Sequence, residues 1–81
     1  MYYVRKAFDI RLDNNDPVQK LVLLALATKA ERNGRSEITP GEIAKMCGIT
    51  HADVVSALVA LMNKGLIKKL RGFFCVYELL F

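Results

Sequence analysis

The sequence predicts a mainly helical α+β fold, a winged helix-turn-helix with three helices and a C-terminal β-hairpin wing. Residues 39–67 contain two amphipathic helix patterns joined by a glycine turn at Cys47-Gly48-Ile49. A more apolar helix pattern precedes this stretch, and two short strand patterns follow it. The 81 residues suit one small domain. We expect an extended arm at 1–15, a three-helix core at 16–67 and the wing hairpin at 66–81.

The N-terminal segment alternates apolar and charged side chains. Its apolar residues are two or four apart, which favours a short strand or extended arm; they are Tyr2, Val4, Phe8, Ile10 and Leu12. The polar cluster at 13–16 then indicates a turn.

The first predicted helix begins with Asp16 as its cap and Pro17 at its first position, and Gln19 follows. Apolar residues cover most of its circumference between Val18 and Ala27, which implies burial on more than one side. Its expected C-terminal end is marked by Gly34 and by three bases that either compensate the helix dipole or bind phosphate: Lys29, Arg32 and Arg35.

The two helices of the helix-turn-helix each have a predicted N-cap. Thr39, Pro40 and Glu42 form a capping box, and Thr50 with Asp53 repeats the arrangement at the next helix. The buried stripe of the second helix consists of Val54, Ala57, Leu58, Leu61 and Met62. Its outward face then carries few side chains that read bases, since Ala52, Val55, Val59 and Ala60 are apolar.

The wing is predicted from two strand-like runs, 66–69 and 73–80, with the turn at Leu70-Arg71-Gly72. Residues 36–38 form a further extended segment that we expect to pair with the end of the chain. Three bases near the hairpin tip either contact phosphates or protect an edge strand from aggregation; they are Lys68, Lys69 and Arg71. The residues that we expect to contact DNA are Lys45, Thr50, His51, Ser56, Asn63, Lys64, Lys68, Lys69 and Arg71.

The C-terminal strand is apolar on both alternating faces, although a half-buried antiparallel strand usually has one polar face. Either the N-terminal arm or another subunit is expected to cover the second face, and we predict a homodimer or a larger assembly. The predicted interface comprises Tyr2, Val4, Ala52, Val55, Val59, Phe74, Val76 and Leu80.

Composition excludes several classes of protein. The net charge of +4 permits nucleic-acid binding without requiring it, and no acidic residue lies between Asp53 and Glu78. One histidine, no paired catalytic carboxylates and no nucleophile motif argue against an enzyme, a cofactor or a small-molecule substrate. Cys47 and Cys75 lack metal-ligand spacing and suit reduced thiols in a cytoplasmic protein. The longest apolar run, residues 21–27, is far short of the roughly 20 residues that span a bilayer.

The chain resembles the helix-turn-helix domains of phage and plasmid replication-initiation proteins and of small prophage regulators. The matching positions lie between Asp16 and Lys69 and are mostly structural: Pro17, residues 20–27, Ile43-Ala44, residues 48–50, Val54, Ala57-Leu58, Leu61 and residues 65–67. In that family the positions after Thr50 are usually basic or polar, whereas this chain has His51, Ala52, Val55 and Ser56.

Two hypotheses of function follow. The first is a DNA-binding protein of phage or mobile-element type that acts in replication initiation or transcriptional regulation. It would hold double-stranded DNA mainly through phosphate contacts from the wing. The alternative is a protein-interaction or dimerisation module, a phage adaptor or inhibitor, that docks through the apolar outward face of the second helix.

Overall fold

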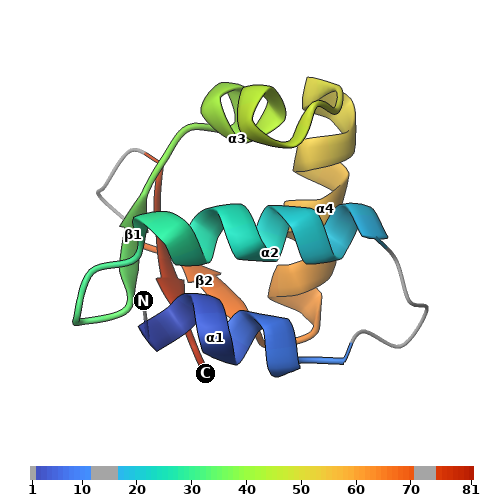
Figure 1. Cartoon of the computed structure of the whole chain (residues 1–81). Coiled ribbons are helices and arrows are strands. Elements are labelled where there is room, and N and C mark those ends of the chain that lie inside the picture. Colours follow the sequence, from blue (N-terminus) through green and yellow to red (C-terminus); the bar gives the residue numbers. More distant parts are fainter. Residues whose placement is uncertain (1, 12–16, 71–74) are drawn as a thin grey trace.

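The computed structural model describes residues 2–11, 17–70 and 75–81. The elements in chain order are α1 (Tyr2–Asp9), α2 (Pro17–Lys29), β1 (Arg35–Glu37), α3 (Pro40–Cys47), α4 (His51–Asn63), β2 (Ile67–Lys69) and β3 (Val76–Leu79). Helix α2 crosses the middle of the fold, with α1 packed along one side of it and α3 and the sheet around the other sides (Figure 1). The arrangement is the predicted winged helix-turn-helix with one additional helix.

The N-terminal segment is a helix, so the prediction of an extended arm was wrong for Tyr2–Asp9. The error came from Phe8, which we assigned to the apolar stripe but which is 62% exposed. The side chains that pack against the core are Tyr3, Val4, Ala7 and Ile10, and this is helical spacing. Ala7 is completely buried and was overlooked because it is small. The expected turn at 13–16, with Asp16 as the predicted cap of the next helix, lies outside the described residues.

Helix α2 begins at Pro17 as predicted but ends at Lys29, before the predicted end. Arg32 therefore lies in a turn and Arg35 begins β1, so neither sits on the last turn of this helix. Gly34 adopts a left-handed conformation with φ of 82° in the connection to β1. The mostly apolar circumference of α2 is explained by burial on several sides, with Val22, Leu23 and Leu26 fully inaccessible.

The capping predictions for the helix-turn-helix are confirmed. The Thr39 hydroxyl accepts from the Glu42 amide at 3.1 Å, while the Thr39 amide donates to the Glu42 carboxylate at 3.4 Å. Gly48 is left-handed with φ of 67°, and Thr50 caps α4 by accepting from the Asp53 amide at 3.1 Å. Helices α3 and α4 meet at 108°, within the range of a helix-turn-helix.

The sheet is antiparallel with strand order β1-β3-β2, so the predicted pairing of residues 36–38 with the chain end is confirmed for β1. Strand β2 covers Ile67–Lys69 and so ends where predicted, and β3 covers Val76–Leu79 within the predicted run 73–80, of which residues 73 and 74 lie outside the described residues. The predicted turn residues Arg71 and Gly72 lie outside the described residues. Tyr77 and Leu79 point into the core, which places Val76, Glu78 and Leu80 on the outer face.

No single helix in the described residues is long and apolar enough to cross a membrane; α3 and α4 pass that test of length and composition only together, as a bent pair.

Candidate nucleic-acid interface

Helix α4 presents the outward face that the sequence predicted. Val54, Ala57, Leu58 and Leu61 are buried, while His51, Ala52, Val55, Ser56, Val59 and Asn63 are exposed. Thr50, at the N-cap, and Lys45, on α3, are also exposed. Within α4 itself, Ser56, Asn63 and His51 can form hydrogen bonds to base edges. Val55 and Val59 offer only apolar contact, so the helix carries few groups for direct readout.

Lys64 is anchored beside α4 by a residue that the sequence analysis did not assign to the site. Its ammonium donates a 2.7 Å hydrogen bond to the Gln19 side-chain oxygen on the first turn of α2. Gln19 also lines a small hollow of about 150 Å³ with Val18, Asp53 and Ser56. This flank of α4 is therefore polar, and α2 contributes to it. From the sequence we considered Gln19 only as part of a helix cap, so we did not predict the hydrogen bond between Gln19 and Lys64.

The wing supplies the exposed bases. Lys68 and Lys69 are exposed on β2, the edge strand that follows α4. Within the described part of the chain neither side chain is held by a hydrogen bond or an ion pair, in contrast to Lys64. Both ammonium groups are thus available to phosphate oxygens. The third predicted wing base, Arg71, lies outside the described residues.

Acidic residues gather on the opposite side of the wing base. Glu31, Glu37 and Glu42 line a hollow of about 380 Å³ together with Thr39 and Cys75. Three carboxylates around one hollow repel phosphate. DNA that contacts Lys68 and Lys69 is therefore expected to approach from the β2 edge rather than from this hollow.

The residues predicted to form a protein interface occupy separate surfaces. Val55 and Val59 are 41% and 47% exposed on α4, and Ala52 is exposed beside them. Val76 and Leu80 lie on the outer face of the sheet, where Leu80 is 47% exposed. Tyr2 is exposed at the start of α1, whereas Val4 packs against the core of its own chain. Phe74 lies outside the described residues.

From the sequence we considered the N-terminal segment as one possible cover of the outer face of the sheet. In the structure this segment is α1, and it lies elsewhere. It packs on α2, and the Tyr3 ring meets Phe81 edge-on with ring centres 6.2 Å apart. Phe81 follows Leu79 on the inner side of β3, so this contact extends the core.

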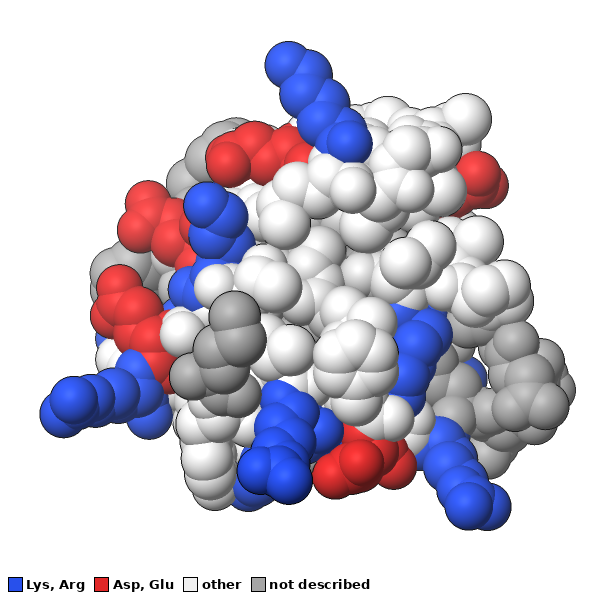
Figure 2. All heavy atoms as spheres, viewed as in Figure 1, with Lys and Arg blue, Asp and Glu red and all other residues white. Residues whose placement is uncertain are grey.

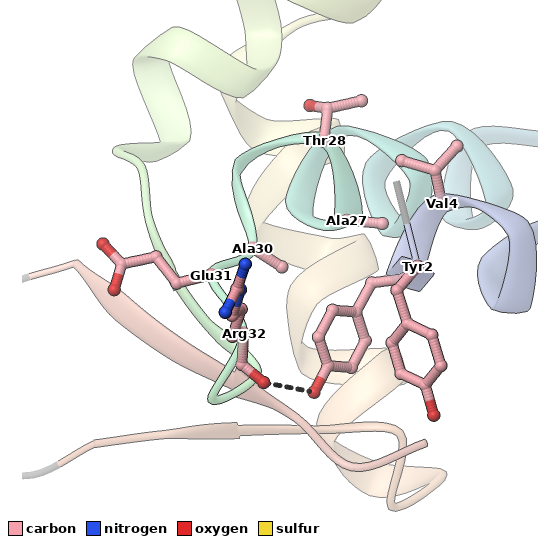
Figure 3. A pocket seen from close by; sticks show the side chains of 8 residues that line it. Tyr2, Val4, Ala27, Thr28, Ala30, Glu31 and Arg32 are labelled. Atoms are coloured by element: carbon pink, nitrogen blue, oxygen red, sulfur yellow. Dashed lines mark hydrogen bonds between the residues drawn. The ribbon is translucent and has the colours of Figure 1, made fainter.

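A hollow between α1 and the end of α2 was not foreseen, because it depends on the helical N-terminus. It measures about 370 Å³ and is lined by Tyr2, Tyr3, Val4, Ala27, Thr28, Ala30, Glu31 and Arg32. The Tyr2 and Tyr3 rings meet edge-on with centres 5.0 Å apart, and the Tyr3 hydroxyl donates to the Arg32 carbonyl oxygen at 3.5 Å, the hydrogen bond that is dashed in Figure 3. Aromatic walls and one acid–base pair make a mixed surface with no catalytic constellation.

The face of the molecule that carries α1 and α2 has no continuous basic patch. Lys and Arg side chains lie around its edge among Asp and Glu, and the central area is largely uncharged (Figure 2). A nucleic-acid footprint requires clustered bases. The described residues visible on this face therefore form no such cluster of bases.

The Cys47 thiol is a poor nucleophile. Burial raises the pKa of the Cys47 thiol above its ordinary value of 9.0, and its Sγ lies 3.6 Å from the Leu21 carbonyl oxygen. Among the described residues no group of three His, Cys, Asp or Glu side chains could hold a metal ion.

Two capped helices at 108°, followed by an antiparallel hairpin with exposed bases, define a winged helix-turn-helix protein of the DNA-binding class. The sequence profile of the MarR family matches residues 15–72, which is more than two thirds of the chain. The chain belongs to the MarR family, whose members are winged-helix DNA-binding transcription regulators. Searches of curated proteins and of solved structures found no significant match.

Proposed function

We propose that this protein is a regulator of phage or mobile-element type that holds double-stranded DNA mainly through phosphate contacts from its wing. It would act on transcription or on the initiation of replication. The membership of the MarR family supports DNA binding, and the residue pattern between Asp16 and Lys69 supports the phage or plasmid origin.

One observation carries the choice of the wing over the helix. Lys68 and Lys69 are exposed and unanchored on the edge strand, whereas the outward positions of α4 are mainly small or apolar. Phosphate contacts supply affinity without sequence information, and base contacts supply specificity. We therefore expect salt-sensitive binding with a weak preference for sequence, in which shape and deformability of the duplex decide more than base edges.

The test is duplex binding measured by fluorescence anisotropy across a salt series. Lys68→Ala, Lys69→Ala and Arg71→Ala should each weaken binding for all sequences and reduce the salt slope by about 0.9 per lost phosphate contact. Lys29→Ala is the matched control, since Lys29 is an exposed base at the end of α2 and not on a wing strand. Binding that is unaffected by the wing variants, or equally affected by Lys29→Ala, would contradict the proposal.

A second candidate function is favoured by the exposed valines of α4. Val55 and Val59 are 41% and 47% exposed at outward positions of α4, whereas Val54, Leu58 and Leu61 of the same helix are buried. Exposed apolar side chains on one face suit a protein partner or a second copy of the chain. In this alternative the protein is an interaction module, and a homodimer would form through α4.

Analytical ultracentrifugation of Val55→Asp and Val59→Asp tests the alternative. A carboxylate on the contact face should shift a dimer to monomer, because a charge buried without a partner is strongly unfavourable. Ser56→Asp places the same charge on the polar flank of α4 and serves as control. A sedimentation coefficient that is the same in the wild type and both valine variants would rule out self-association through this face.

A further inference from the structure

The outer face of the sheet carries one charged residue from each strand in a single row. The register pairs Glu78 of β3 with Arg35 of β1 on one side and with Lys68 of β2 on the other. Tyr77 and Leu79 are buried, so Glu78 and both of its partners lie on the outer face. Glu78 thus stands between two bases, one of which is a wing lysine.

The carboxylate of Glu78 is unusual in its part of the sequence. It is the single acidic residue between Val54 and Phe81, a segment that contains α4 and the wing. Residues directly opposite each other in an antiparallel pair have Cβ atoms about 4.5–5.5 Å apart, close enough for their side chains to interact. Lys68 and Glu78 occupy such positions, and Glu78 is half-buried; no ion pair joins the two side chains in the described structure, so the Lys68 ammonium is open to phosphate with the carboxylate as its register neighbour.

We propose that Glu78 sets the strength with which the wing holds DNA, by competing with phosphate for the Lys68 ammonium. This inference rests on the proposed function, since it assigns a negative regulator to the same contact surface. A phosphate that approaches Lys68 meets an attractive ammonium and, next to it, a repulsive carboxylate. Glu78 is therefore a positioning residue that acts through Lys68. It keeps non-specific affinity low, and any sequence preference contributed by α4 then weighs more in the total binding.

Substitution of Glu78 by Gln tests this directly in the full chain, with a duplex of random sequence as probe. The variant keeps the shape of the side chain and removes its charge. We expect E78Q to bind the duplex about two- to fivefold more tightly at low salt, the scale of an exposed charge pair. The gain should shrink as salt rises, because exposed charges are screened.

Glu37→Gln provides a strand-matched control. Glu37 is exposed on the same outer face, but its register partner across β1 and β3 is Val76 rather than a base. Both variants change the net charge equally, so any difference between them reports the position of Glu78 opposite Arg35 and Lys68. Equal gains for E78Q and E37Q, or no gain for E78Q, would overturn the inference.

A double-mutant cycle with Lys68→Ala separates this inference from the proposed function. E78Q should lose most of its gain when Lys68 is absent, and a gain that persists unchanged would refute the competition. If Lys68→Ala and Lys69→Ala leave wild-type binding intact, the proposed function itself fails. Thermal unfolding monitors the fold of each variant, and Glu78→Thr, which has high strand propensity, repeats the test if E78Q is unstable.

Discussion

The Lys20 ammonium donates a 2.7 Å hydrogen bond to the Ala7 carbonyl oxygen and thereby joins α2 to the C-terminal end of α1. The same ammonium donates to the carbonyl oxygens of Phe8, at 2.8 Å, and of Ile10. The last carbonyl groups of a helix have no partner within the helix, and a cation at that end is also favoured by the helix dipole. Lys20 thus caps an eight-residue helix that is too short to be stable alone.

Replacing Lys20 by Met should destabilise the protein by about 1–3 kcal/mol, because two partly buried carbonyl groups and one exposed carbonyl group lose their donor. Denaturant unfolding measures this loss. In the Lys20→Met variant, hydrogen exchange should be accelerated more at the α1 amides than at the α2 amides. Lys29→Met removes an exposed lysine from the other end of the same helix and should change stability by less than about 0.5 kcal/mol. Equal stability of the two variants would contradict the capping role of Lys20.

Gly34 should not tolerate alanine. Its φ is 82°, and an added Cβ would lie 3.0 Å from the Tyr3 hydroxyl oxygen and 3.2 Å from the Leu79 carbonyl oxygen. The left-handed backbone alone costs an alanine about 1–2 kcal/mol, so we expect at least this loss in the free energy of unfolding. Chemical denaturation of Gly34→Ala measures it.

Two further variants separate the causes of that loss. Gly41→Ala in the first turn of α3 meets only the Thr39 hydroxyl oxygen at 3.8 Å and should be neutral or stabilising by up to about 1 kcal/mol. Tyr3→Phe removes the hydroxyl that is closest to the added methyl group. It should therefore restore part of the stability of Gly34→Ala, and full additivity of the two changes would show that the contact is unimportant.

The fold was largely predictable because its signals are local. The caps at Thr39 and Thr50 and the turn at Gly48 depend on residues within a few positions of one another, so the sequence displays them directly. The N-terminal helix was missed because its stability comes from Lys20, ten or more residues away, and from the burial of Ala7. The candidate site was predictable to the same extent. The charge of Lys68 and Lys69 indicated their exposure on an edge strand, but the contact of Gln19 with Lys64 and the position of Glu78 opposite Lys68 arise only from tertiary packing and strand register.

Tyr77 should make stability fall at alkaline pH. Burial, and secondarily the charge of Cys75, raise the pKa of its phenol above the ordinary value of 10.0. The folded state then holds the proton more tightly than the unfolded state. The resulting stability is fully present below pH 10.0 and is lost as pH rises through the higher folded-state value.

Urea unfolding between pH 8 and pH 11 compares the wild type with Tyr77→Phe to check this. The two proteins share every other titrating group, so the difference in their pH profiles reports Tyr77. We expect the wild type to lose stability more steeply above pH 10.0 than the variant. Parallel profiles would show that the phenol has the same proton affinity in both states.

Val59 offers a single position at which the two proposed functions predict opposite results. It is 47% exposed at the centre of the outward face of α4. If α4 lies against DNA, Val59→Lys adds a cation near the phosphates, tightens duplex binding and raises the salt slope by about 0.9. If α4 is a protein interface, the same lysine introduces an unpaired charge into an apolar contact and weakens self-association.

Val59→Gln is the matched control, with a polar side chain of no charge. Anisotropy with duplex DNA and sedimentation of the free protein, both at the same salt concentration, distinguish the outcomes. A lysine that tightens DNA binding and leaves sedimentation unchanged assigns this face to DNA. Dissociation of a dimer with no gain in DNA binding assigns it to a protein partner.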